Sequence, residues 1–100
     1  MQFVVIARDE SSPEAPARRA AARADHLEAI RPFVEAGQIL VGGAVLDADD
    51  VMVGSVLITE FGSRDELDAW LSRDPYVTAG VWESIEVWPY RAAVGAWMPE

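Results

Sequence analysis

The feature that most constrains the fold is the order of strand-like and helix-like segments along this chain of 100 residues. Runs rich in β-branched and aromatic residues predict strands, and apolar residues that repeat every three to four positions predict helices. The first helix is expected to begin at Pro13 or Glu14 and to end at Ala36, and the second covers 63–73. Strands are expected at 2–7, 38–47, 51–61 and 81–91.

Short local signals support these boundaries. Ser63 with Glu66 three residues later is a capping-box pattern that begins a helix. Gly37 supplies a stop for the first helix, and Pro32 is expected to kink that helix because proline lacks the backbone N–H. The Ala-Asp-Asp segment at 48–50 suits a hairpin turn between the second and third strands.

This order predicts an α+β fold of the ferredoxin-like βαββαβ type, with a four-stranded antiparallel sheet and both helices on one face. We expect one domain over 1–100, with a core at 1–91 and a tail at 92–100. The strand at 51–61 is apolar on both faces, as Val56 and Leu57 illustrate, so its second face also needs cover. Trp82 and Trp88 are assigned to that outer face, which a second copy of the chain is expected to cover in a homodimer or a higher oligomer.

Composition excludes several functional classes. The net charge is −9, which opposes binding to nucleic acid, and the chain has no cysteine for thiolate metal sites. No apolar run reaches the length of a membrane span, and no basic leader follows Met1, so we expect a cytoplasmic protein that does not bind membranes. The aspartates at 47, 49 and 50 are interpreted as a solvated turn, and we expect neither a metal nor a cofactor.

The only histidine, His26, is predicted to lie near Asp74. If the first strand runs upward, the first helix returns downward and the second helix rises, so the N-terminal half of the first helix and the Asp-Pro-Tyr segment share one end. A carboxylate that binds one imidazole nitrogen makes the other a better base for proton transfer. Two interpretations of Asp74 remain open, because an Asp before Pro is also a common N-cap, here of a short turn closed by Gly80.

Several segments resemble one family over nearly the whole chain. They are "FVVIARD" at 3–9, the Arg23 and His26 pair, "GQILVGGAVLD" at 37–47, "GSVLI" at 54–58 and "RDPYVTAGVWESIEVWPY" at 73–90. In these motifs the sequence resembles the YCII-related (YciI-like) family. The resemblance implies a ferredoxin-like subunit that pairs into a dimeric α/β barrel, with an active site on His26 and Asp74. The segment 11–22, "GGAVL" where Gly-Pro is common, and the tail with Trp97 depart from the family pattern.

Three further residues are candidates for substrate binding. Ser55 follows Gly54 on a strand and can face a pocket, although a small residue beside a strand glycine equally serves packing. Tyr76 belongs to the Asp-Pro-Tyr segment, and Arg8 ends the first strand. Arg8 is also the expected partner of Glu86, a carboxylate assigned to the outer face.

The leading functional hypothesis is a small-molecule enzyme of lyase or isomerase type, in which His26 and Asp74 transfer a proton on a cyclic or carbonyl-bearing substrate. The alternative is a non-catalytic module that binds a metabolite or mediates assembly. A monooxygenase built on the same barrel is a third possibility.

Overall fold

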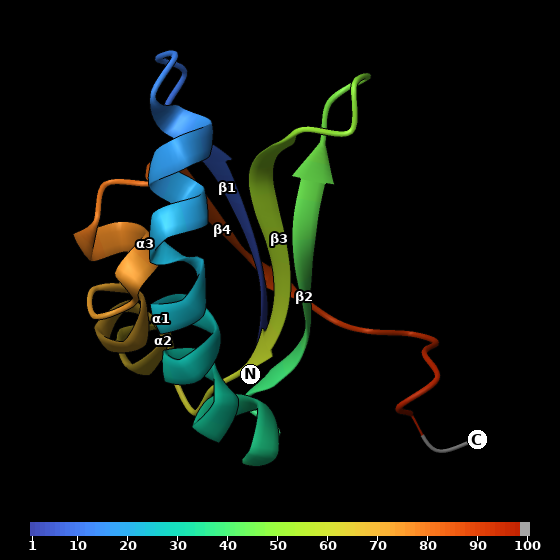
Figure 1. The fold of residues 1–100 in the computed structure, drawn as a ribbon. Coiled ribbons are helices and arrows are strands. Elements are labelled where there is room, and N and C mark those ends of the chain that lie inside the picture. The colour runs from blue at the N-terminus through green and yellow to red at the C-terminus, as the bar shows by residue number, and fades with distance from the viewer. Residues whose placement is uncertain (99–100) are drawn as a thin grey trace.

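A computed structural model describes residues 1–98 and contains four strands and three helices (Figure 1). The strands are β1 (Gln2–Asp9), β2 (Ile39–Leu46), β3 (Met52–Glu60) and β4 (Trp82–Tyr90). The helices are α1 (Ala15–Glu35), α2 (Arg64–Leu71) and the short α3 (Pro75–Thr78). The predicted βαββαβ order is confirmed, with α3 inserted between α2 and β4.

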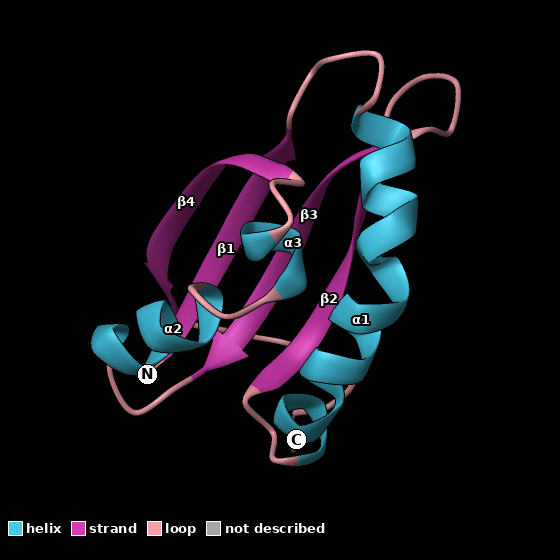
Figure 2. Ribbon diagram, turned by 60° about the vertical axis from the view of Figure 1, so that its left-hand side comes forward, coloured by secondary structure: helices cyan, strands magenta, loops and turns pink. Residues whose placement is uncertain are grey.

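The strands form one sheet in the order β2-β3-β1-β4, and every neighbouring pair is antiparallel. All three helices lie on one face of this sheet, with α1 over the β2 side and α3 over the middle (Figure 2). The ferredoxin-like α+β prediction is therefore confirmed. Phe3, Val5 and Ala7 on β1 alternate toward the helices and are buried, as the two-residue period of a strand requires.

Helix boundaries follow local chemistry. The hydroxyl oxygen of Ser63 accepts the backbone N–H of Glu66 at 3.1 Å, and the Glu66 carboxylate in turn accepts the N–H of Gly62 at 3.0 Å. The predicted cap of α2 is thus confirmed, although the return bond reaches one residue further than in a standard capping box. Pro32 lies in the last turn of α1, which continues to Glu35 as one assigned helix. No helix within residues 1–98 is long and apolar enough to cross a membrane.

Gly54 permits close packing between β3 and β1. A Cβ atom built at this position would lie 2.5 Å from the carbonyl oxygen of Ala7, which is backbone and cannot move aside. Gly54 is therefore a site of close backbone approach. The hairpin turn after β2 is organised by Asp47, whose carboxylate accepts the N–H groups of Asp49 and Val51.

The second face of the sheet carries no helix. Its side chains include Val56, which is 36% exposed, and Trp88, which is 58% exposed. Among residues 1–98 only the tail projects on this side, away from the helices (Figure 1). The outer face expected from the sequence therefore carries exposed apolar side chains.

Trp82 does not share that outer face, so its predicted position is wrong. On β4, Ser84 pairs with Arg8 but Trp82 pairs with Asp9, which leaves Glu83 as an extra residue. A bulge of one residue moves the following side chain to the opposite face of a sheet. Trp82 is consequently 6% exposed and lies on the helix side.

The predicted partnership of Arg8 and Glu86 is also not found in the described part of the chain. Arg8 is opposite Ser84, whereas Glu86 is opposite Ile6. The Glu86 carboxylate instead accepts a long hydrogen bond of 3.4 Å from the indole N–H of Trp88. Both charged side chains are exposed, so neither needs an ionic partner to avoid an unpaired buried charge.

Candidate active site

The structure brings His26 and Asp74 into direct contact. Nδ1 of His26 lies 2.8 Å from Oδ2 of Asp74. The same oxygen accepts the backbone N–H of Tyr76 at 2.9 Å, which makes Asp74 the N-cap of α3. Asp74 therefore caps α3 and contacts His26 through the same oxygen. Because its carboxylate oxygen accepts both bonds, Nδ1 of His26 carries the hydrogen and Nε2 is the basic nitrogen.

The second imidazole nitrogen of His26, Nε2, has no hydrogen-bond partner within residues 1–98. His26 itself is 8% exposed, and its side chain borders a cavity of about 300 Å³ between α1 and the sheet. The cavity is lined from α1 by Arg19, Arg23, His26, Leu27, Ile30 and Val34, and from the sheet and α3 by Ile39, Gly42, Gly43, Ala44, Met52, Ser55, Leu57, Tyr76 and Trp82.

Aromatic rings hold the imidazole in place. The ring of Tyr76 is stacked on that of His26, with centroids 3.9 Å apart and planes inclined by 6°. Trp82 meets His26 edge-on at 6.0 Å and Tyr76 at 5.5 Å. Burial raises the pKa of Tyr76 above its ordinary value of 10.0, with Arg19 and Arg23 acting in the opposite direction. The phenol is therefore neutral at neutral pH.

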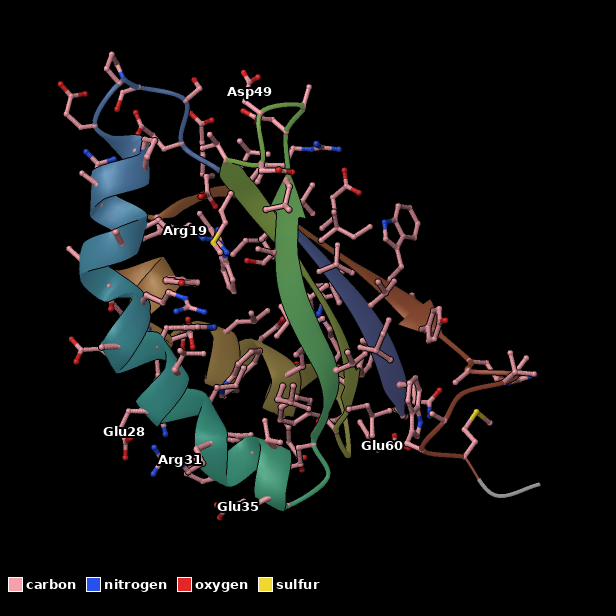
Figure 3. All side chains as sticks on the ribbon, turned by 45° about the vertical axis from the view of Figure 1, so that its right-hand side comes forward. Arg19, Glu28, Arg31, Glu35, Asp49 and Glu60 are labelled. Carbon is pink, nitrogen blue, oxygen red and sulfur yellow. The ribbon has the colours of Figure 1, made fainter. Side chains whose placement is uncertain are left out.

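A buried ion pair forms the other end of the cavity. Nη1 of Arg19 donates to both carboxylate oxygens of Asp9, at 2.8 and 2.9 Å, and Nη2 donates to Oγ of Ser55 at 2.8 Å. The guanidinium carbon also lies 4.8 Å from the centre of the Tyr76 ring. Figure 3 shows Arg19 reaching from α1 toward the strands. Arg19 thus connects α1, β1 and β3 around the cavity.

Sequence reasoning missed Arg19, Asp9 and the inward position of Trp82. A signal for Arg19 exists in the spacing of α1, because the buried residues at 15, 19, 22, 26 and 30 form one helical stripe. Arg19 occupies the same stripe as His26, two turns earlier. The segment 11–22, which departs from the family pattern, therefore supplies a residue of the cavity.

The remaining candidates separate into two groups. Ser55 and Tyr76 line the cavity beside His26, as expected for substrate-binding residues. Arg8 does not join them, because it is exposed on the opposite face of the sheet.

Another hollow of about 420 Å³ lies between α1 and α2, over Phe33, Phe61 and Trp70. Asp74 also borders that hollow, but His26 does not.

Known proteins share this architecture. Protein YciI of Escherichia coli O6:H1 is 32% identical over 97 residues, which cover 91% of this chain and 97% of that protein. A proposed antibiotic biosynthesis monooxygenase of Nitrosomonas europaea has a TM-score of 0.56, with 18% identity over 94% of this chain and all of that one. At that identity the likeness shows the fold alone.

A nearer structural relative is an enzyme. The 5-chloro-2-hydroxyhydroquinone dehydrochlorinase TftG of Burkholderia phenoliruptrix AC1100, solved in complex with 2,5-dihydroxybenzoquinone, has a TM-score of 0.81 and 31% identity. The match covers 91% of this chain and 94% of that one. The sequence pattern of the YCII-related domain matches residues 1–91. The chain therefore belongs to the YCII-related domain family, whose structural neighbours lie in the dimeric α/β barrel superfamily.

Proposed function

We propose that this protein is a proton-transfer enzyme of lyase or isomerase type, with His26 as acid and base and Asp74 as the residue that orients it. The observation that carries the proposal is the 2.8 Å contact between the two side chains at the wall of a cavity. A carboxylate on Nδ1 holds the tautomer in which Nε2 accepts a proton. The cavity volume of about 300 Å³ suits a single-ring substrate.

The proposed step begins when Nε2 of His26 removes a proton from a ring carbon next to a carbonyl group. The electron pair of the broken C–H bond forms a C=C bond, and the carbonyl π electrons move to oxygen to give an enolate. An isomerase returns the proton to another atom of the enolate. A lyase re-forms the carbonyl and expels a leaving group such as chloride, after which the imidazolium releases its proton to water.

The likeness to TftG supports the proposal of a ring substrate that carries oxygen atoms, because the structure of TftG was solved in complex with 2,5-dihydroxybenzoquinone. We propose the same general class here, acting in the cytoplasm in a homodimer formed through the open sheet face. The proposed step uses only protein side chains and the substrate, without a metal or an organic cofactor. The alternative, a module that only binds metabolites, predicts ligand stabilisation without proton transfer.

Deuterium exchange tests the proton-transfer step on its own, whichever overall reaction the step belongs to. Exchange at a ring carbon of 2,5-dihydroxybenzoquinone requires one proton to be added and one removed, and NMR in D₂O follows it directly. We expect the wild type to accelerate exchange and His26→Gln to lose about 10²–10⁴-fold of that rate. Glu28→Gln, an exposed change on the same helix, is the control. Equal exchange by wild type and His26→Gln, or none by the wild type, contradicts the proposal.

A further inference from the structure

The hydroxyl group of Ser55 receives two hydrogen bonds from groups that can only donate. Nη2 of Arg19 lies 2.8 Å from Oγ, and the indole Nε1 of Trp82 lies 3.2 Å from the same atom. A hydroxyl offers two lone pairs and one hydrogen. Both lone pairs are therefore occupied, and the hydrogen points in the remaining direction.

No acceptor within residues 1–98 receives that hydrogen. Ser55 is 5% exposed and lines the cavity beside His26. Buried polar groups in folded proteins are usually hydrogen-bonded, and a buried donor hydrogen left unpaired costs free energy. The missing acceptor must therefore come from whatever occupies the cavity.

Arg19, which lines the same wall, carries a second unmatched donor. Its Nε is buried and has no partner among the described residues, whereas Nη1 and Nη2 are bonded to Asp9 and Ser55. Arg19 is 5% exposed and also lines the cavity. Ser55 thus presents its hydrogen to the cavity, beside the positive charge of Arg19, and a ligand oxygen with free lone pairs would accept it.

We infer that Ser55 is the residue that selects the substrate oxygen, donating its hydrogen bond to a conjugated carbonyl or enolate oxygen of a hydroxylated ring. The inference rests on the proposed function, because an enolate forms at this oxygen when His26 removes the proton. The hydrogen bond strengthens as negative charge develops there, since bonds to charged acceptors are the stronger ones. Arg19 and Trp82 act as positioning residues that fix the hydroxyl.

The test is a spectrophotometric titration of the protein with 2,5-dihydroxybenzoquinone. We expect Ser55→Ala to raise Kd about 10- to 100-fold, the range of one hydrogen bond to a charged oxygen. Ser55→Thr retains a hydroxyl and should recover most of the affinity. Ser84→Ala removes a serine hydroxyl from the opposite sheet face and should leave Kd unchanged. Equal affinity of wild type and Ser55→Ala overturns the inference, as does a wild type that does not bind.

Infrared spectroscopy supplies a measurement that does not depend on how the variants fold. A donated hydrogen bond lowers the carbonyl stretching frequency of the quinone bound to the wild type, relative to the same compound in an apolar solvent. An unshifted carbonyl overturns the inference. The proposed function is tested independently, because the exchange rate of His26→Gln does not depend on the Kd of Ser55→Ala. If Ser55→Ala weakens binding but His26→Gln does not slow exchange, the role of Ser55 in binding the oxygen stands and the proposed enzymatic function is contradicted.

Discussion

The ring of Tyr76 lies parallel to the imidazole of His26 at a centroid distance of 3.9 Å, with the Arg19 guanidinium also over the Tyr76 ring. Arg19 and His26 are two turns apart on α1, about 10 Å along the helix axis, and both side chains contact the Tyr76 ring. The contact ties α3 to α1. It fixes the position of His26 by packing as well as by the bond to Asp74.

Burial of Tyr76 predicts a loss of stability at alkaline pH. The pKa of Tyr76 is raised in the folded protein, so the unfolded chain releases this proton at a lower pH than the folded protein does. The free energy of unfolding should therefore fall as pH rises through about 10, and the loss from this group is complete above the folded pKa. Tyr76→Phe should remove this part of the alkaline decline in denaturant titrations. Tyr90→Phe, at a half-exposed site, should retain it.

Asp74→Asn separates the cap from the orienting carboxylate. Asparagine caps helices about as well as aspartate, so the free energy of unfolding should change by less than about 0.5 kcal/mol. The amide oxygen can accept both hydrogen bonds that Oδ2 of Asp74 accepts, from Nδ1 of His26 and from the N–H of Tyr76, so the cap and the tautomer are kept. A neutral amide does not stabilise the imidazolium that forms when Nε2 takes up a proton, so we expect a loss of about 10²-fold or more of the exchange rate, with the retained tautomer read from the ¹⁵N chemical shifts of the lone imidazole. Asp68→Asn, an exposed site on α2, is the matched control, and equal rates for the two variants would contradict the orienting role.

The neighbouring arginines 18 and 19 should differ sharply in their effect on stability. Arg19 pairs with Asp9 in a nearly fully buried contact, whereas Arg18 pairs with Glu10 in a contact that is about one-third exposed. Removing one partner of a buried pair leaves an uncompensated charge, so Arg19→Met should cost about 3–5 kcal/mol. Arg18→Met should cost about 0–1 kcal/mol. Urea denaturation of both variants checks this, and similar losses would exclude a structural role for the buried pair.

The open sheet face predicts self-association through β3. Val56 lies on this face, and a glutamate there would be buried without a partner in a homodimer, at a cost of several kcal/mol. Sedimentation should show dimers for the wild type and monomers or unfolded chains for Val56→Glu. Ala17→Glu, an exposed change on α1, should leave the dimer intact. A wild type that is monomeric at micromolar concentration would rule out this interface.

The sequence by itself determined the type and order of the main elements, because their periods depend on near neighbours along the chain. The same order places α1 beside the segment that follows α2, which is why the contact between His26, near the middle of α1, and Asp74 follows from connectivity. The N-cap role of Asp74 is likewise local, since it depends only on Asp74, Pro75 and the amide of Tyr76.

Only the tertiary structure decided which residues surround the histidine. Trp82 faces the cavity because of a bulge opposite Arg8 and Asp9, and such a register shift depends on pairing between two strands distant in sequence. Arg19 is buried because Asp9 and Ser55, on two different strands, meet its guanidinium. A charged residue in a helical stripe does not reveal its partners, because burial of that charge is stabilised by groups that only folding brings together.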